Sequence, residues 1–225
     1  MAPPRRKAPS EARGRIPEKT VERLSQYRRA LETGLKCSER ERKTVFSHEI
    51  AEMCGLTAAQ VRRDLMIVGH HGSTTRGYDC RDLVRAINEL LGRSGVQRMV
   101  LVGVGHLGRA LLSYFVDRSR MYAAVAAFDI DEAKTDKLVS GVLCYPMEKL
   151  AEVVRRERVS IRVVAVPEEA AQEVAGALVN AGIRGIVNFA PTRLQVPDGV
   201  FLETVDITGA VEKVAFFVCE ERKDR

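Results

Sequence analysis

The sequence has few cysteines, and no two of them form a CxxC pair. The five cysteines are odd in number and widely scattered, at Cys37, Cys54, Cys80, Cys144 and Cys219. This pattern argues against a disulfide framework and against a structural zinc site, because both need cysteines at characteristic spacings. We therefore expect reduced thiols and no bound metal.

Long apolar runs are also absent. No run approaches the ~18–20 residues that cross a bilayer, and the N-terminus lacks the apolar core of a signal peptide. We expect a soluble, cytoplasmic protein.

Charge is balanced over most of the chain but not at its start. Residues 1–80 contain 16 Lys and Arg against 10 Asp and Glu, whereas residues 81–225 contain 20 of each kind. A basic module joined to a neutral one indicates that the first part meets a polyanion, although a solvated basic surface would give the same count. Residues 1–15 are rich in Pro, Arg and Ala and cannot build a core, so they are interpreted as a flexible basic arm that either touches DNA phosphates or adds solubility.

Residues 16–92 have the pattern of a winged helix-turn-helix. A first helix starts at Pro17 and ends at Gly34, and its apolar face is formed by Val21, Leu24, Leu31 and Leu35. The next helix is capped by Ser47 and stopped by Gly55, and its inward residues are Ile50, Ala51 and Cys54. A third helix begins with the capping-box pair Thr57 and Gln60 and buries Val61 and Leu65. Two short helices joined by a tight turn predict a helix-turn-helix.

The stretch 66–80 predicts a wing. An apolar strand over "MIV" is followed by a glycine-bounded turn and by Arg76-Gly77-Tyr78, which is typical of a β-hairpin. His70 and His71 are interpreted as surface or turn residues rather than metal ligands. Residues 81–92 close the domain with a helix whose apolar stripe is Leu83, Ile87, Leu90 and Leu91, and the domain boundary falls at Gly92–Gly95.

The third helix has the side chains of a recognition helix. Arg suits the hydrogen-bond acceptors of guanine and Gln those of adenine, although incidental charges on an exposed helix are the alternative. Lys43 and Arg76 are candidates for phosphate contacts. The full set of candidate DNA-binding residues is Lys43, Thr57, Gln60, Arg62, Arg63, Arg76 and Tyr78.

Residues 93–206 alternate between apolar strands and amphipathic helices. Strands are predicted at Met99–Val102, Ala123–Asp129, Val142–Tyr145, Ile161–Val166, Gly185–Phe189 and Val200–Val205. Continuous apolar strands separated by helices, such as those over 147–159 and 167–182, indicate a parallel sheet covered on both faces. The expected fold class is α/β, with a Rossmann domain after the winged helix.

A glycine-rich loop follows the first of these strands. In "VGVGHLG", Gly103 suits the tight turn, Gly105 lets the backbone approach a pyrophosphate, and Gly108 permits close helix packing. Asp129 ends the second strand and is suited to the ribose hydroxyls, with Asp131 as the weaker candidate. An acid there opposes a 2′-phosphate, so NAD(H) is favoured over NADP(H), and a purely structural glycine turn is the alternative. The candidate cofactor residues are Gly103, Val104, Gly105, His106, Leu107, Gly108, Asp129, Val166, Pro167, Asn188 and Phe189.

No catalytic residue is evident. The chain has four histidines, of which three belong to the winged helix. His106 lies beside the expected pyrophosphate and far from the reacting nicotinamide. Only one helix remains after the sixth strand, so a substrate domain is missing and we do not expect an enzyme.

The last segment, 207–225, is too apolar for the surface of a monomer. Ile207, Val211, Val214 and Val218 recur at helical spacing, while Phe216 and Phe217 point elsewhere. We expect a partner subunit to cover this dimerisation helix.

The sequence resembles the Rex family of redox-sensing transcriptional repressors over nearly its whole length after residue 15. The similar segments, in order, are "IPEKTVERLSQYRR", "LTAAQVRRDL", "RGYD", "GVGHLGRAL", "FDID", "VPEEAAQEVA", "AGIRGIVNFAP" and "LETVD". The resemblance implies a homodimer that binds palindromic operator DNA, senses NADH and NAD⁺, exchanges its C-terminal helix between subunits and leaves DNA when NADH is high. It also implies polar contacts between domains at Arg29, Tyr114 and Asp206.

Two other functions stay open at this point. An NAD-dependent oxidoreductase with a basic appendage is disfavoured by the missing substrate domain. A CoA-binding subunit is suggested by "VVAVPEEAA" and "AGIRGIVNF", which also resemble succinyl-CoA synthetases, but Asp129 and the winged helix argue against it.

Overall fold

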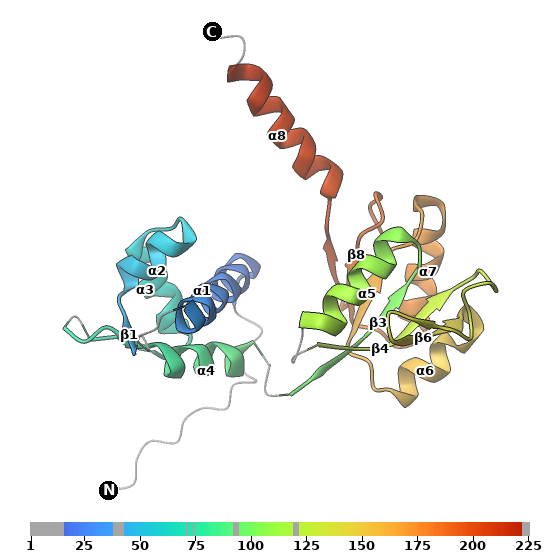
Figure 1. Ribbon diagram of the computed structural model, residues 1–225, viewed down its shortest axis with the longest axis horizontal. Helices are drawn as coiled ribbons and strands as arrows, with labels where there is room; N and C mark the ends of the chain where they lie inside the picture. The colour runs from blue at the N-terminus through green and yellow to red at the C-terminus, as the bar shows by residue number, and fades with distance from the viewer. Residues whose placement is uncertain are drawn as a thin grey trace, which may run out of the picture. The chain divides into compact units, whose positions relative to one another are not determined.

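The structure is a computed structural model that describes residues 16–37, 43–70, 72–73, 75–91, 95–118 and 122–221. The chain forms two compact units, Met1–Gly95 and Val96–Arg225, which Figure 1 colours blue to green and green to red. The predicted arm of residues 1–15 and His71 lie outside the described residues. Among the helices that the structure describes, none is long and apolar enough to cross a membrane.

The described residues of unit 1 form four helices beside a small two-stranded sheet. Its elements are α1 (Glu18–Cys37), β1 (Thr44–Val45), α2 (Ser47–Cys54), α3 (Ala58–Ile67), β2 (Tyr78–Asp79) and α4 (Cys80–Leu90). They enclose one apolar core, formed by Leu24, Tyr27, Leu31, Val45, Ile50, Ala51, Val61, Leu65, Cys80, Leu83 and Ile87. The helix-turn-helix is therefore held by side chains from every helix of the unit.

Three details of the first helices differ from the prediction. Gly34 does not end α1, which continues to Cys37, because a single glycine inside a helix costs only about 1 kcal/mol. Val21 is 40% exposed, and Tyr27 occupies the core position instead. Ser47 is the first residue of α2 rather than its cap, since the Phe46 N–H is capped by the Glu49 carboxylate at 2.7 Å.

The predicted wing strand over residues 66–68 is wrong. Met66 and Ile67 continue α3, whose end is closed by Gly69 in the left-handed region at φ 78°. The N–H of Gly69 donates to the Met66 carbonyl and that of His70 to the Leu65 carbonyl, the bonds of a Schellman motif. The strand pairing that forms is between β1 and β2, antiparallel, with Val45 opposite Tyr78.

Unit 2 is built on a seven-stranded sheet in the order β5-β6-β4-β3-β7-β8-β9. The strands are β3 (Gln97–Val102), β4 (Tyr122–Asp129), β5 (Leu138–Val139), β6 (Val142–Pro146), β7 (Ile161–Val164), β8 (Gly185–Asn188) and β9 (Phe201–Thr204). All neighbours pair in parallel except β5, a short edge strand that pairs antiparallel with β6. Without β5, which the sequence did not predict, the order is that of a Rossmann sheet. The α/β fold class is confirmed.

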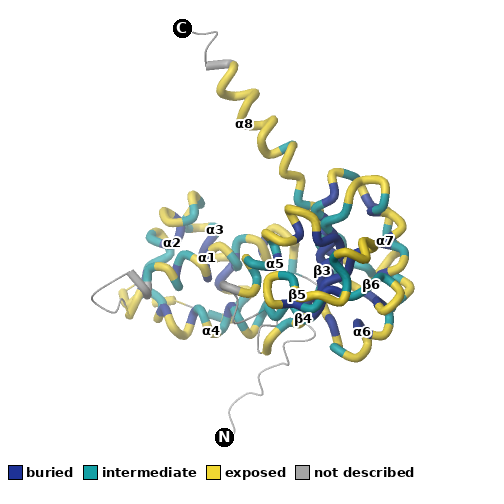
Figure 2. The backbone as a smooth tube through the Cα atoms, turned by 45° about the vertical axis from the view of Figure 1, so that its right-hand side comes forward, coloured by how far each residue is buried: buried dark blue, intermediate teal, exposed yellow. Residues whose placement is uncertain are grey.

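Helices cover both faces of this sheet. They are α5 (His106–Arg118), the 3₁₀ turn η2 (Met147–Lys149) with α6 (Leu150–Arg156), and α7 (Glu168–Asn180). Leu150 and Val154 of α6 and Leu178 of α7 pack with Phe128 in one core, while Leu112 of α5 packs with Leu101 in another. Figure 2 shows the resulting buried layer along β3 and β4.

The last helix, α8 (Ile207–Glu221), follows the edge strand β9. Its apolar side chains are half or more exposed, from 50% at Ile207 to 64% at Val211 and Val214. Phe216 and Phe217 contact each other edge to face, and each is exposed as well. Figure 2 shows this exposure along nearly all of the helix.

Candidate dinucleotide site and DNA-binding surface

The three glycines of the motif differ in what the surrounding structure requires. Gly103 and Gly105 lie in the loop between β3 and α5, and Gly108 lies in the first turn of α5. Gly103 has φ 96°, and a side chain there would meet the Ala165 carbonyl oxygen at 2.6 Å. At Gly108 a side chain would lie 1.9 Å from the Gly103 carbonyl oxygen. At Gly105 it would meet nothing within 4 Å. The fold itself therefore requires glycine at positions 103 and 108. Gly105 instead leaves open space, where the protein backbone is expected to contact the pyrophosphate of a ligand.

Asp129 ties the end of β4 to this loop. The side chain is 8% exposed, and its carboxylate accepts the Val104 N–H at 2.8 Å and the Asp131 N–H at 3.0 Å. Because α5 begins at His106, its first-turn N–H groups lie at the end of the same loop. Backbone donors and a carboxylate thus meet at the carboxyl end of the parallel strands, where Rossmann domains bind ligands.

Lys134 completes this cluster, although the sequence analysis did not single it out. Its ammonium lies 3.4 Å from the Asp129 carboxylate and 3.2 Å from that of Asp131. The hydrogen bond to Asp131 is the main cause of the raised pKa of Lys134. The pKa of Asp131 is lowered mainly by a hydrogen bond from the Ala133 N–H and next by the hydrogen bond from Lys134. The sequence signal that could have identified Lys134 is a basic residue in the turn that follows β4.

The remaining cofactor candidates lie around the same edge of the sheet. His106 and Leu107 are exposed at the start of α5, and Val166 lies against Gly103, where it would crowd a side chain at 2.8 Å. Pro167 is exposed at the start of α7, and Phe189 is half-buried after β8. Asn188 is fully buried, with its amide donating to the Ala190 and Thr192 carbonyls at 3.2 and 2.9 Å. Its side chain therefore shapes the turn that follows β8.

In unit 1, the predicted recognition residues lie on the outer side of α3. The Thr57 hydroxyl caps α3 by accepting the Gln60 N–H at 3.3 Å, as predicted. Val61 and Leu65 are fully buried, so the intervening Arg62 and Arg63 are exposed and Gln60 is half-buried. Arg62 also donates to the Ser47 hydroxyl of α2 at 3.1 Å. The helix therefore presents two guanidinium groups to the solvent.

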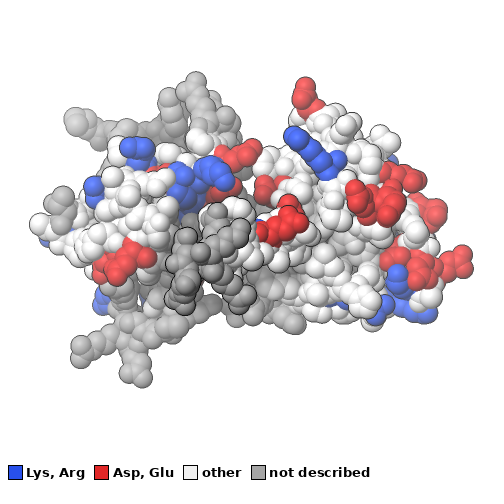
Figure 3. Space-filling model, turned by 90° about the horizontal axis from the view of Figure 1, so that it is seen from above, with Lys and Arg blue, Asp and Glu red and all other residues white. Residues whose placement is uncertain are grey.

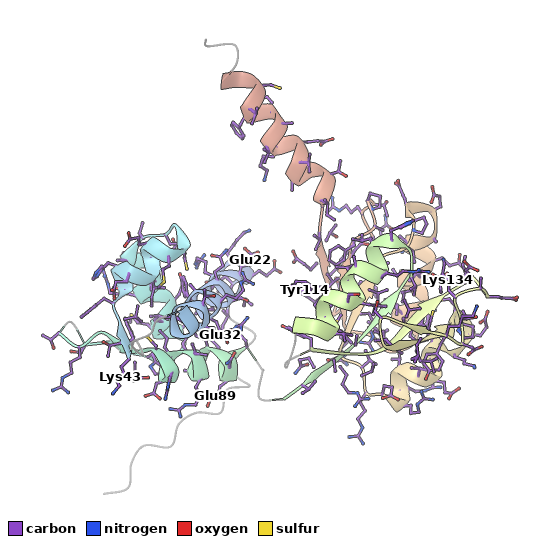
Figure 4. The ribbon with its side chains drawn as sticks, in the orientation of Figure 1. Glu22, Glu32, Lys43, Glu89, Tyr114 and Lys134 are labelled. Atoms are coloured by element: carbon purple, nitrogen blue, oxygen red, sulfur yellow. The ribbon has the colours of Figure 1, made fainter. Side chains whose placement is uncertain are left out.

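The wing is a tight turn closed between Ser73 and Gly77. Each residue donates its N–H to the carbonyl of the other, at 3.2 and 2.8 Å. Gly77 has φ 69°, and a side chain there would meet the Val45 carbonyl oxygen at 2.6 Å. Arg76 is exposed on this turn, while Tyr78 is half-buried in β2. Lys43, labelled in Figure 4, is exposed immediately before β1.

A buried polar cluster joins α1 to α3. The Arg23 guanidinium donates to both carboxylate oxygens of Asp64, at 2.7 and 2.8 Å, and the Tyr27 hydroxyl donates to the same carboxylate at 2.8 Å. Asp64 is 2% exposed and Tyr27 fully buried. The pKa of Tyr27 is raised first by burial and then by its hydrogen bond to Asp64. The pKa of Arg23 is raised mainly by its own hydrogen bonds to Asp64. Sequence reasoning missed this cluster because local spacing cannot reveal a pairing over 41 residues.

The three residues assigned to polar contacts between domains lie on different elements. Arg29 is exposed on α1. Tyr114 is 53% exposed on α5, where its ring meets that of Phe115 edge to face. Asp206 precedes α8 and accepts the Gly209 N–H at 2.8 Å, so it caps that helix. Among the described residues, no group of His, Cys, Asp and Glu could hold a metal ion.

Comparison with known proteins relates both units to families. Residues 15–65 match the family "Putative DNA-binding protein N-terminus", and residues 96–192 match "CoA binding domain". The redox-sensing transcriptional repressor Rex of Carboxydothermus hydrogenoformans is 43% identical over 90% of this chain and 96% of its own length. Rex of Streptomyces avermitilis is 41% identical over 99% of this chain and 86% of its own.

Solved structures agree with these relatives. The Rex-family repressor RSP, crystallised with β-NAD⁺ and operator DNA, is similar with a TM-score of 0.84 at 30% identity, covering 92% of this chain and 94% of RSP. RSP with β-NADH gives a TM-score of 0.80 at the same identity, covering 92% of this chain and 96% of RSP. The chain belongs to the Rex family of redox-sensing transcriptional repressors.

Proposed function

We propose that this protein is a transcriptional repressor that binds operator DNA through α3 and the wing and is released by NADH bound in unit 2. The observation that carries the proposal is that one chain joins a capped recognition helix with exposed Arg62 and Arg63 to a glycine loop anchored by Asp129. The RSP structures with operator DNA, NAD⁺ and NADH support it, because RSP shares the fold at 30% identity.

The residues of unit 2 fit a dinucleotide. The open space at Gly105 admits a pyrophosphate, and Asp129 lies at the end of β4, where the acid of a Rossmann domain contacts the ribose hydroxyls. The bound cofactor supplies a nicotinamide ring that is charged when oxidised and neutral when reduced. A dry pocket near Val166 and Phe189, covered by α8 of a second subunit, would therefore favour NADH.

A regulatory function accounts for the nucleotide-binding glycine loop without any catalytic step. Among the described residues, α8 is the only element that follows the last strand of the sheet, and His106 is exposed at the start of α5. A bound nucleotide then acts as a signal by stabilising one of two dimer shapes. A coupling free energy of about 1–3 kcal/mol gives a roughly 5–150-fold change in DNA affinity. The oxidoreductase and CoA-binding alternatives are not favoured.

The domain organisation follows from this function. Residues 16–92 read DNA, residues 93–206 bind the nucleotide, and residues 207–225 hold the dimer. A palindromic operator presents two half-sites about 34–36 Å apart, so two copies of α3 are needed. The exposed apolar side chains of α8 supply the contact between copies, and Arg29, Tyr114 and Asp206 are the polar residues that link the domains across the dimer.

Titration of an operator duplex decides this proposal. Operator affinity should fall when NADH replaces NAD⁺, at fixed ionic strength because phosphate contacts depend on salt. Arg63→Ala should weaken operator binding by about 1–3 kcal/mol while leaving NADH affinity unchanged. Operator affinity that does not respond to NADH would overturn the sensing role. Operator affinity and specificity that are unchanged from the unaltered protein in both Arg62→Ala and Arg63→Ala would remove α3 from the groove.

Truncation after Asp206 tests the role of α8. We expect a monomer, or an aggregating protein, that has lost tight operator binding. Analytical ultracentrifugation with and without NADH gives the readout. A stable dimer that NADH still releases from DNA would show that the interface lies elsewhere.

A further inference from the structure

The turn after β4 holds a cation where the discrimination between NADH and NADPH is made. Rossmann domains distinguish the two cofactors at the ribose 2′ position, which the acid at the end of the second strand contacts. Here that acid is Asp129, and the Lys134 ammonium lies 3.4 Å from it and 3.2 Å from Asp131. Figure 4 labels Lys134 in this part of unit 2.

Lys134 changes the electrostatics that Asp129 alone would produce. An isolated acid repels a 2′-phosphate, but a cation within ion-pair distance offsets much of that repulsion. The Lys134 side chain is 28% exposed and that of Asp131 is 45% exposed, so a ligand can approach this pair from the solvent. Lysine binds phosphate as a mobile point charge. Figure 3 shows that acidic side chains form several groups on one face of unit 2.

A second lysine of the same turn provides a contrast. Lys137 donates to the Ala133 carbonyl at 2.7 Å, and its charge is only the smallest of the causes that lower the pKa of Asp131. It carries the same charge on the same segment with a different partner. It is therefore the matched control for Lys134.

We propose that Lys134 is a specificity-determining residue of the dinucleotide site, which lets the site bind the 2′-phosphate of NADPH despite Asp129. This inference rests on the proposed NADH site and deepens it. The preference for NADH over NADPH is then set by the balance of Asp129, Asp131 and Lys134. The unaltered protein prefers NADH, and removal of the ammonium widens that preference.

The experiment measures dissociation constants of NADH and NADPH for the full-length protein and for Lys134→Ala, Lys134→Gln and Lys137→Ala. Lys134→Ala should weaken NADPH binding by about five- to tenfold more than NADH binding, the effect of one charge near a phosphate in a solvent-screened site. Lys137→Ala should leave the ratio unchanged. Lys134→Gln keeps the chain length and a donor, and it should behave like Lys134→Ala if charge is the cause.

Three results would overturn the proposal. The first is an unchanged ratio of the NADPH and NADH dissociation constants in both Lys134 variants. The second is an equal loss of affinity for both cofactors, and the third is an equally large increase of that ratio in Lys137→Ala. Raising the salt concentration should weaken NADPH binding to the unaltered protein more than to Lys134→Ala. The unaltered protein's response to NADH on operator DNA tests the proposed function separately, since it does not depend on Lys134.

Discussion

Removal of the Asp64 carboxylate should destabilise unit 1 by about 3 kcal/mol. Asp64→Ala leaves the Arg23 guanidinium without its bidentate partner and the buried Tyr27 hydroxyl without an acceptor. Breaking a buried ion pair from one side costs roughly 3–5 kcal/mol. We take the lower end of this range because the Arg23 side chain is 19% exposed and can recover hydration.

This destabilisation should also weaken DNA binding, because the cluster fixes α3 to α1. A change of about 3 kcal/mol lowers the melting temperature of a domain of this size by roughly 12–24 °C. The assay is thermal unfolding followed by circular dichroism, combined with an operator titration at low temperature. NADH affinity serves as the internal control, since it belongs to unit 2.

A double-mutant cycle separates the pair from other effects. Arg23→Ala combined with Asp64→Ala should cost less than the sum of the two single variants, because the second removal leaves no new unpaired charge. Asp82→Ala is the matched surface control, since its Arg85 partner is 2.6 Å away and both side chains are more than half exposed. That pair should contribute about 0–1 kcal/mol. An Asp64→Ala variant no less stable than Asp82→Ala would refute the reasoning.

Three further predictions follow from buried groups and close contacts. Gly105→Ala should fold normally but bind NADH more weakly, whereas Gly108→Ala should lower the melting temperature, because only the latter side chain meets the protein, at 1.9 Å; equal stability of the two variants would contradict this. Burial raises the pKa of Tyr27 above its ordinary value of 10.0, so its contribution to stability is complete below about pH 10 and is lost at higher pH. The unfolding free energy of Tyr27→Phe should therefore decline less steeply above pH 10 than that of the unaltered protein, and parallel curves for the two proteins would argue against this reasoning. Burial lowers the pKa of Arg162 to about 10, and its Nε has no hydrogen-bond partner among the described residues. Arg162→Met should therefore raise the unfolding free energy by about 1–3 kcal/mol at neutral pH, with a smaller gain above pH 10; a loss of stability in urea titrations would show that the guanidinium has a structural role.

Local chemistry predicted the parts of the fold that depend on neighbouring residues. Thr57 caps α3, and Val61 and Leu65 are buried beneath it, because a capping residue and an i, i+4 pair fix a helix start and its inner face. The glycine loop and Asp129 meet because the carboxyl ends of adjacent parallel strands lie at the same edge of a sheet. These features need no knowledge of distant contacts.

Features that depend on tertiary structure were not predictable in this way. The apolar run from Met66 fits a strand as well as the end of a helix, and the Gly69 cap decided between them. The partner of β2 is β1, more than thirty positions earlier in the chain, so reading the hairpin from one stretch gave the wrong strand. In the same way, Lys134 acquires its importance only when the turn after β4 brings it to Asp129 and Asp131.

The exposure of α8 makes protein concentration a variable of regulation. A helix with its apolar side chains in solvent gains stability only when another molecule covers them, and that gain grows with the concentration of the other molecule. If the other molecule is a second copy, the concentration of dimer, and with it operator occupancy, rises faster than in proportion to the amount of protein as long as most of the protein is monomeric. A cell could therefore set the NADH level at which genes are released by changing how much of this repressor it makes.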